Sequence, residues 1–368
     1  MISSYKNQIS NKLKALVVYS PQNTNIYVVG SLRVSRELSY NAKLSDIDLL
    51  IVPVCDSLDD YVAHFKQLIN IADKLNLPSD QLVEFFILPS SIVDIYTTCL
   101  SVISGDSKLQ DEDLVYKAKD HGADQPQEQL VPSLKARKGL YVAASEKFRG
   151  DYARLMPVAD TGRARKTAKC LLRGLKLIVC AHTDEDSLMK MEQRLTSVDT
   201  FSQMRPILSE LVKDTDFTID DIWQDTLDGH AVDDWSEWMM AQEAVAKQLL
   251  GHRFDMDNAD VRFYDGLYQA RELLVAGIKN VLNEKRLDYQ KEYMETFAND
   301  TASVIVKLAL SGVECLIDFE DTATPSIVSD SSVLLIEYLK GDLVSLRHMA
   351  ACVVLLEYAF KQSLIIAK

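Results

Sequence analysis

The chain has 368 residues, of which 47% are hydrophobic and 26% charged, and its formal net charge at pH 7 is -14. This length allows two domains, and the composition is that of a globular protein rather than a disordered chain. Long nucleic acid is not an expected partner, because proteins that grip phosphate backbones usually present basic surfaces.

The six cysteines stand apart from one another, and they form no CxxC pair and no Cys/His cluster with the spacing of a zinc site. The longest apolar runs, at 49–55 and 349–360, are too short or too interrupted to cross a bilayer. The N-terminus lacks the pattern of a signal peptide. We therefore expect a cytoplasmic protein without membrane attachment.

The first third of the chain alternates short apolar runs with helical patterns. The runs predict strands at 26–29, 48–54, 82–88 and 114–117. Apolar residues at helical spacing predict helices at 1–20, 57–77 and 90–104, and the second of these opens on a capping pattern at Ser57. Such an alternation favours a small mixed sheet accompanied by helices.

The pattern changes after this first third. The stretch 119–132 is polar and contains two prolines, which is typical of a linker, and we place the linker at 121–132. The sequence that follows shows helical periodicity throughout. We therefore predict an α+β protein with an α/β domain at 1–120 and a large all-α domain at 133–368.

Four residues of the first domain form a pattern that suits phosphate chemistry. Gly30 and Ser31 follow the first predicted strand and precede a predicted helix, where a close backbone and free amides suit a phosphate group. Asp46 and Asp48 stand two positions apart at the next strand, so that both point to one face of the sheet. Carboxylates beside a phosphate-binding turn predict a magnesium site.

This order of strand, Gly-Ser, helix and Asp-x-Asp resembles the nucleotidyltransferase superfamily that includes DNA polymerase beta. In layout the chain is most similar to the aminoglycoside nucleotidyltransferases, which have a C-terminal helical domain. The resemblance covers roughly the first third of the chain. It implies two magnesium ions at Asp46, Asp48 and a third carboxylate, and a nucleoside triphosphate, ATP as first candidate, at Gly30 and Ser31.

The third carboxylate is a choice between Glu84 and Asp94. Glu84 lies inside the apolar run at 82–88, where a charge is costly unless it is paired or bound to a metal. Asp94 lies in a predicted helix, where a solvated position is the ordinary interpretation. We prefer Glu84, either as a metal ligand or as the general base that the family places at this position.

Lys166, Lys169, Arg173 and Lys176 follow one another at intervals of three or four residues, which places them along one face of a helix. In the related enzymes the helical domain presents such cations to the triphosphate, so the resemblance implies that role for Lys169, Arg173 and Lys176. A solvated basic face is the alternative.

The segment 210–238 contains many acidic residues, a single lysine and all three tryptophans of the chain. An acidic pocket lined by tryptophan would suit a cationic acceptor. The alternative is an exposed acidic helix whose tryptophans anchor it to the core.

The predicted function is magnesium-dependent transfer of a nucleoside monophosphate from a nucleoside triphosphate to an acceptor hydroxyl, with release of pyrophosphate. A small molecule is the first candidate acceptor, and a protein side chain, as in AMPylating enzymes, is the second. The alternative is a nucleotide-binding regulatory or antitoxin-like module with little turnover. It is favoured by residues 32–35, which read LRVS where the family often has Ala-Arg-Gly.

Overall fold

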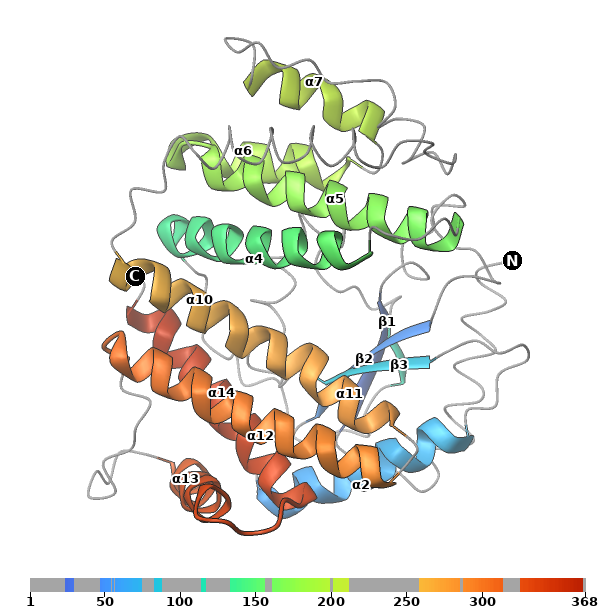
Figure 1. The fold of residues 1–368 in the computed structure, drawn as a ribbon, viewed down its shortest axis with the longest axis vertical. Helices are drawn as coiled ribbons and strands as arrows, with labels where there is room; N and C mark the ends of the chain where they lie inside the picture. Colours follow the sequence, from blue (N-terminus) through green and yellow to red (C-terminus); the bar gives the residue numbers. More distant parts are fainter. Residues whose placement is uncertain are drawn as a thin grey trace. The chain divides into compact units, whose positions relative to one another are not determined.

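The computed structural model describes the protein over twelve segments of the chain. They are 24–29, 47–53, 55, 57–74, 83–87, 114–116, 133–155, 161–198, 201–211, 258–284, 287–313 and 325–366. Within them the protein is mostly helical and has one small sheet, which confirms the α+β class (Figure 1). The predicted helices at 1–20 and 90–104 and the predicted linker lie outside the described residues.

The sheet has four strands in the order β3-β2-β1-β4. Its strands are β1 (Thr24–Val29), β2 (Ile47–Pro53), β3 (Val83–Ile87) and β4 (Leu114–Tyr116), and each overlaps a predicted strand. β1 pairs antiparallel with β2 and with β4, whereas β2 and β3 are parallel. The mixed sheet expected from the sequence is therefore present.

Strand β2 occupies the centre of this sheet and is buried on both faces. Four consecutive residues, Leu49, Leu50, Ile51 and Val52, are between 0% and 5% exposed. A strand covered on both sides has apolar residues in succession rather than in alternation. Burial on both faces therefore explains the continuous apolar run of this strand.

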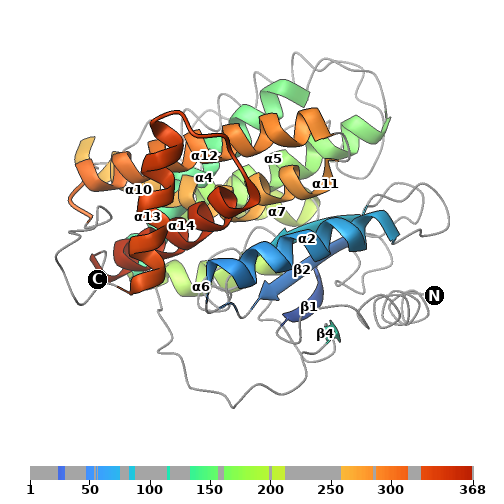
Figure 2. The ribbon, with the colours of Figure 1, turned by 90° about the horizontal axis from the view of Figure 1, so that it is seen from below.

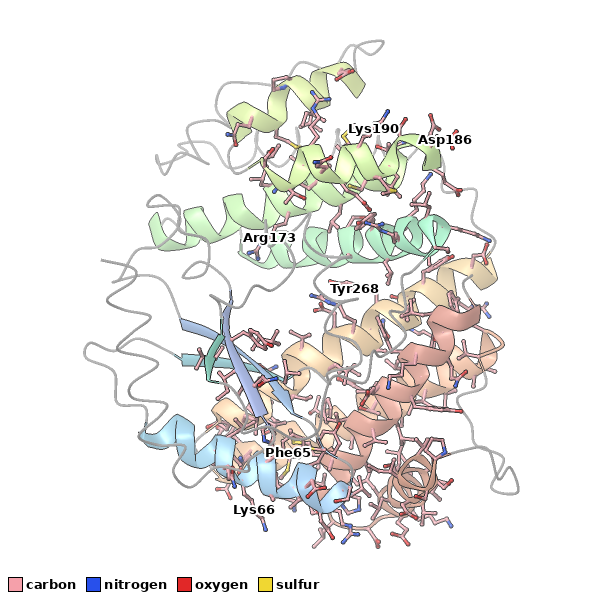
Figure 3. All side chains as sticks on the ribbon, turned by 180° about the vertical axis from the view of Figure 1, so that it is seen from behind. Phe65, Lys66, Arg173, Asp186, Lys190 and Tyr268 are labelled. Atoms are coloured by element: carbon pink, nitrogen blue, oxygen red, sulfur yellow. The ribbon has the colours of Figure 1, made fainter. Side chains whose placement is uncertain are left out.

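Helix α2 (Leu58–Lys74) connects β2 to β3. At its start the Ser57 hydroxyl accepts a hydrogen bond from the Asp60 amide at 3.2 Å and donates one to the Asp60 carboxylate at 2.7 Å. The predicted capping pattern is thus confirmed. Phe65 is fully buried, whereas the neighbouring Lys66 points to solvent (Figure 3). The buried face of α2 also includes Leu58, Tyr61 and Leu68.

The chain divides into two compact units. Unit 1 comprises Met1–Thr97, Lys108–Val131 and Gly266–Lys368, and unit 2 comprises Thr98–Ser107 and Pro132–Asp265. One boundary between the units falls between residues 131 and 132. The predicted all-α domain at 133–368, however, is shared between the two units, because its part from Gly266 onward groups with the sheet.

Unit 1 combines the sheet and α2 with helices from the C-terminal part of the chain. These are the π-helix η4 (Leu273–Gly277), α11 (Ile278–Asn283), α12 (Leu287–Leu310), α13 (Ser326–Leu339) and α14 (Leu346–Ile366). Helix α11 contacts β3 and α2, and α14 contacts α2, α12 and α13 (Figure 2). Contacts between residues far apart in sequence therefore build this unit.

Unit 2 is helical throughout its described part. It contains α4 (Leu134–Leu155), α5 (Thr161–His182), α6 (Glu185–Thr196), α7 (Phe201–Leu211) and the first half of α10 (Asn258–Glu272). Its longest helices, α4 and α5, pack against each other along their length (Figure 1). Across the described segments of both units, no helix is long and apolar enough to span a bilayer.

Candidate functional site

The parallel pairing of β2 with β3 brings two of the predicted site residues to matching positions. Asp48 of β2 is the register partner of Glu84 of β3. On its other side, Asp48 is the register partner of Val29, the last residue of β1. Positions in register on neighbouring strands lie on the same face of a sheet. The two acidic positions are thus neighbours, and the strand that precedes Gly30 ends beside them.

The remaining residues of the predicted magnesium and nucleotide site are not among those that the structure describes. Gly30, Ser31, Asp46 and the alternative acid Asp94 lie outside the described residues. For Asp48 and Glu84 the description covers the backbone. Among the side chains that are described, no group of three His, Cys, Asp or Glu residues has an arrangement that could hold a metal ion.

The predicted basic stripe lies on α5, but its residues differ in exposure. Arg173 is exposed (Figure 3), whereas Lys176 is only 3% exposed. From Leu172 onward α5 is buried on nearly all sides, since the residues flanking Lys176 are 1% and 0% exposed. Lys176 therefore does not share a solvated face with Arg173. For Lys166 and Lys169 the description is again of the backbone, and the expected contacts with a triphosphate stay a prediction.

The acidic, tryptophan-containing segment at 210–238 lies outside the described residues apart from its first two positions. The expectation of an acceptor pocket there stays a prediction.

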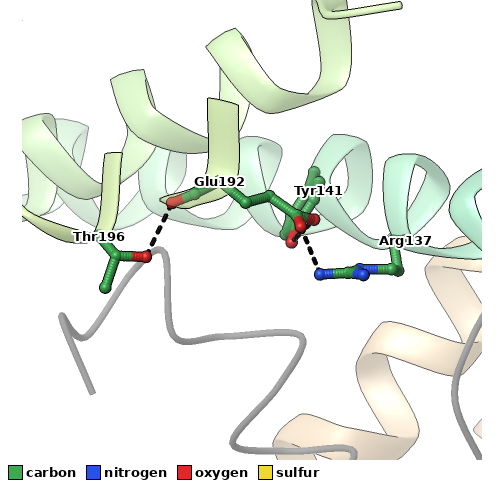
Figure 4. A network of polar contacts seen from close by, with 4 residues as sticks. All are labelled: Arg137, Tyr141, Glu192 and Thr196. Atoms are coloured by element: carbon green, nitrogen blue, oxygen red, sulfur yellow. Dashed lines mark hydrogen bonds and ion pairs between the residues drawn. The ribbon is translucent and has the colours of Figure 1, made fainter. Parts of the chain in front are cut away.

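Unit 2 contains a buried carboxylate that the sequence did not single out. Glu192 of α6 is 6% exposed and forms an ion pair with Arg137 of α4 (Figure 4). The Tyr141 hydroxyl, also on α4, donates a hydrogen bond to the other carboxylate oxygen at 2.6 Å. Thr196 donates to the backbone carbonyl of Glu192 at 2.8 Å. Both carboxylate oxygens are thus bound by residues of the chain itself, and the network ties α6 to α4.

The electrostatics around Glu192 extend to α5. Burial raises the pKa of Glu192, and the hydrogen bond from Tyr141 and the charge of Arg137 lower it. Burial also raises the pKa of the Cys180 thiol far above its usual range, and the nearby Glu192 raises it further. The cations Arg137 and Lys176 oppose this shift. Burial and the charge of Glu192 therefore favour the thiol form of Cys180, which is a poor nucleophile.

Sequence reasoning missed this network because its residues are 51 and 55 positions apart. Residues at such separations form no local periodic pattern. A weak signal existed in Arg137 and Tyr141, which are one helical turn apart on α4 and so share a face.

Comparison with known proteins returns no match to this chain, whether with family models, curated protein sequences or solved structures.

Proposed function

We propose that this protein is a magnesium-dependent nucleotidyltransferase whose reaction centre lies on the sheet of unit 1. The observation that carries the proposal is the register that pairs Asp48 with Glu84 on neighbouring parallel strands. Two acidic residues directly opposite each other destabilise a sheet unless a cation compensates their charge. Asp46 stands two positions before Asp48 and adds a third carboxylate to the same region of the chain.

The donor set fits magnesium. Carboxylate oxygens are the protein ligands that magnesium prefers, and it leaves other positions to water and substrate phosphates. Asp46 and Asp48 would hold the metal, with Glu84 as the third carboxylate. When bound, magnesium would neutralise part of the charge on the triphosphate and orient it for displacement.

Gly30 and Ser31 would bind and orient the triphosphate. Gly30 and Ser31 follow β1, where a backbone without a Cβ obstruction and the amides of a following helix would receive the triphosphate. The acceptor hydroxyl oxygen forms a bond to the α-phosphorus, the bond from that phosphorus to the oxygen of the leaving pyrophosphate breaks, and the hydroxyl proton passes to Glu84 or to solvent. Catalysis consists of positioning and charge compensation.

Glu84 has two candidate roles, as a metal ligand or as the base that takes the proton of the acceptor hydroxyl. The variant Glu84→Gln separates them. Loss of a base lowers the maximal rate and removes the acidic limb of the pH–rate profile. Loss of a ligand raises the magnesium concentration that half-saturates the reaction.

The experiment that tests the proposal measures pyrophosphate release from each nucleoside triphosphate in the presence of magnesium and sets of small-molecule and protein acceptors. Asp48→Asn should lower the rate by about a hundredfold or more, because it removes a charge that compensates the metal and the phosphates. The matched controls are Asp300→Asn and Glu292→Gln, which change exposed acids of α12 in the same unit. They should leave the rate unchanged.

Two outcomes would contradict the proposal. Equal rates for the wild type and Asp48→Asn would show that the acidic pair has no part in the reaction. Magnesium-dependent binding of a triphosphate without any release of pyrophosphate would favour a regulatory module instead. Residues 32–35 give that second function its support, because they depart from the family pattern directly after Gly30 and Ser31.

A further inference from the structure

Helix α6 lies on the surface of unit 2 and buries a single narrow side. It contacts α4 and α5, and its buried residues are Leu188, Glu192 and Leu195. Their spacing of four and three positions places them on one seam along the helix. Most of its other residues are exposed, among them Asp186 and Lys190 (Figure 3). The attachment of α6 therefore rests mainly on the three side chains of the seam.

The middle of this seam is a carboxylate rather than an apolar side chain. Glu192 pairs with Arg137 of α4 and accepts a hydrogen bond from the Tyr141 hydroxyl at 2.6 Å (Figure 4). Moving an ionised carboxylate from water to such donors yields little net free energy, because the lost hydration offsets much of the attraction. Glu192 therefore fixes the position of α6 on α4, whereas the two leucines supply the apolar part of the contact.

Buried residues lie directly before and after the segment that contains α6. Thr183 precedes it, is buried, and donates a hydrogen bond from its hydroxyl to the Val179 carbonyl of α5 at 2.8 Å. Val198 follows it and is also buried. Between them the N-cap residue Asp184 is exposed, and within this described segment its side chain makes no capping hydrogen bond. The segment 184–197 is therefore a discrete piece between two packed neighbours.

The C-terminal half of α5 shows the opposite situation within the same unit. Every residue from Leu175 to Ala181 is between 0% and 5% exposed. A helix that is buried on all sides opens only when the structure around it unfolds, whereas an element with few buried apolar side chains opens at lower cost. Helices α5 and α6 should therefore differ widely in local stability.

We propose that α6 is a latch, which opens from α4 and α5 as one unit over residues 184–197 and which Glu192 holds closed as an internal ligand of Arg137 and Tyr141. In the open state, water solvates the Glu192 carboxylate and the two donors of α4 that faced it. An apolar side chain at this position would hold the seam more firmly, whereas a carboxylate exchanges its donors for water at little net cost. The network thus gives α6 one closed position and keeps opening accessible.

The test is amide hydrogen exchange of the full chain, followed peptide by peptide by mass spectrometry at constant pH. In the wild type, the amides of 189–196 on α6 should exchange together and about a hundredfold or more faster than those of 175–181 on α5. Low concentrations of denaturant should leave the exchange of α6 unchanged, because a local opening exposes little surface. They should accelerate the exchange of α5, because that exchange requires unfolding of the surrounding structure.

Substitutions in the seam test whether Glu192 is the internal ligand. Glu192→Ala should accelerate the exchange of α6 by about a hundredfold or more, because the closed state then lacks the carboxylate that pairs with the largely buried guanidinium of Arg137. The double variant Arg137→Met with Glu192→Leu removes both charges and should recover most of the lost protection. The matched control is Gln193→Ala, which changes the exposed neighbour on the same helix and should exchange as the wild type does.

A substitution in the core of α5 provides the reciprocal test. Ile178 is buried and stands two positions from Cys180, so it lies on the other side of α5 from the thiol near Glu192. Ile178→Val removes one methyl group and should accelerate the exchange of 175–181 by about fivefold. It should leave the exchange of α6 unchanged, because Ile178 stays packed when the latch opens.

The proposal would be overturned if the amides of α6 and α5 exchanged at the same rate and with the same dependence on denaturant, since α6 would then open only by unfolding of the unit. It would also be overturned if Glu192→Ala accelerated the exchange of α5 but not that of α6, since the contacts of Glu192 would then persist through the opening. Each of these outcomes is independent of pyrophosphate release and of the acidic pair on the sheet.

Discussion

Acidic residues occupy two contrasting settings in the two units. In unit 2, Glu192 is buried but its carboxylate is bound by Arg137 and by the Tyr141 hydroxyl of the same chain. In unit 1, the register of β2 and β3 sets Asp48 against a second acid, Glu84. A carboxylate that is satisfied internally contributes to packing, whereas two acids at matching positions on neighbouring strands repel each other, a repulsion that a bound cation would relieve. This difference separates a structural acid from a candidate site.

Unit 1 also contains a buried titratable group, His64 of α2, whose setting differs from that of Glu192. Its side chain is 3% exposed, and burial lowers its pKa from 6.5 to about 4. His64 is therefore neutral in the folded protein at neutral pH. Glu192 lies beside the opposite charge of Arg137, whereas burial makes His64 lose its own charge.

The largest effect is expected from removing the buried carboxylate of unit 2. Glu192→Ala removes the carboxylate that pairs with the largely buried guanidinium of Arg137, and it should lower the free energy of unfolding by about 3–5 kcal/mol. Chemical denaturation measures this. The double variant Arg137→Met with Glu192→Leu removes both charges and should cost clearly less. If the single variant is as stable as the wild type, the network is not the structural tie described above.

The next effect is a pH dependence that originates at His64. Because the folded pKa lies below that of the unfolded chain, the unfolded state takes up a proton first as the pH falls. The stability associated with a neutral His64 is fully present above pH 6.5 and is lost as the pH falls from 6.5 to about 4. The shift corresponds to roughly 3 kcal/mol at about 1.4 kcal/mol per pKa unit.

The measurement compares the free energy of unfolding of the wild type and of His64→Gln at several pH values. The variant should lose less stability than the wild type as the pH falls, while other groups titrate equally in both proteins. Parallel pH profiles for the two proteins would contradict the lowered pKa.

A smaller effect concerns the acidic pair of unit 1. Magnesium should stabilise the wild type against thermal unfolding, by about 2.7 kcal/mol when its free concentration is a hundred times the dissociation constant. Asp48→Asn should abolish most of this stabilisation, and without magnesium it should be at least as stable as the wild type, because it relieves a repulsion. Asp300→Asn, the exposed control on α12, should respond to magnesium as the wild type does. Equal stabilisation of all three proteins would place the magnesium elsewhere.

The smallest effect is expected at an ion pair on the surface of unit 2. Arg194 and Glu210 approach to 3.2 Å, but their side chains are 46% and 65% exposed. Glu210→Ala should change the free energy of unfolding by less than about 0.5 kcal/mol, because water screens the pair. Its contrast with Glu192→Ala isolates the contribution of burial. If Glu210→Ala lowered the free energy of unfolding as much as Glu192→Ala, burial would not explain the difference between the two ion pairs.

The strands and the helix after Ser57 could be predicted from the sequence because their signals are local. The run that contains Leu49 to Val52 is apolar without interruption, and the Ser57 cap requires residues only three positions apart. The family resemblance implied that Asp48 and Glu84 belong to one site, because the family places a third carboxylate with the Asp-x-Asp pair. Their parallel register, however, depends on how β2 and β3 align, which is a tertiary property.

The exposure of individual side chains and the grouping of segments distant in sequence could not be predicted from local patterns. The periodicity of α5 placed Lys176 on a face with Arg173, but packing decides which part of that face reaches water, and Lys176 is buried. The pairing of Glu192 with Arg137 joins residues 55 positions apart. The grouping of residues 266–368 with the sheet likewise depends on contacts between the two ends of the chain.

That grouping has a consequence for the order in which the protein is made. The sheet and α2 leave the ribosome first, whereas α11 and α14, which pack against β3 and α2, come from the last part of the chain. The larger part of unit 2, at 132–265, is synthesised in between, before the C-terminal helices of unit 1 exist. Folding of unit 1 is then completed by contacts between residues that are far apart in the sequence, and such contacts form slowly. A chain that stops before residue 266 would contain the sheet and α2 but would lack α11, α12, α13 and α14 of the same unit.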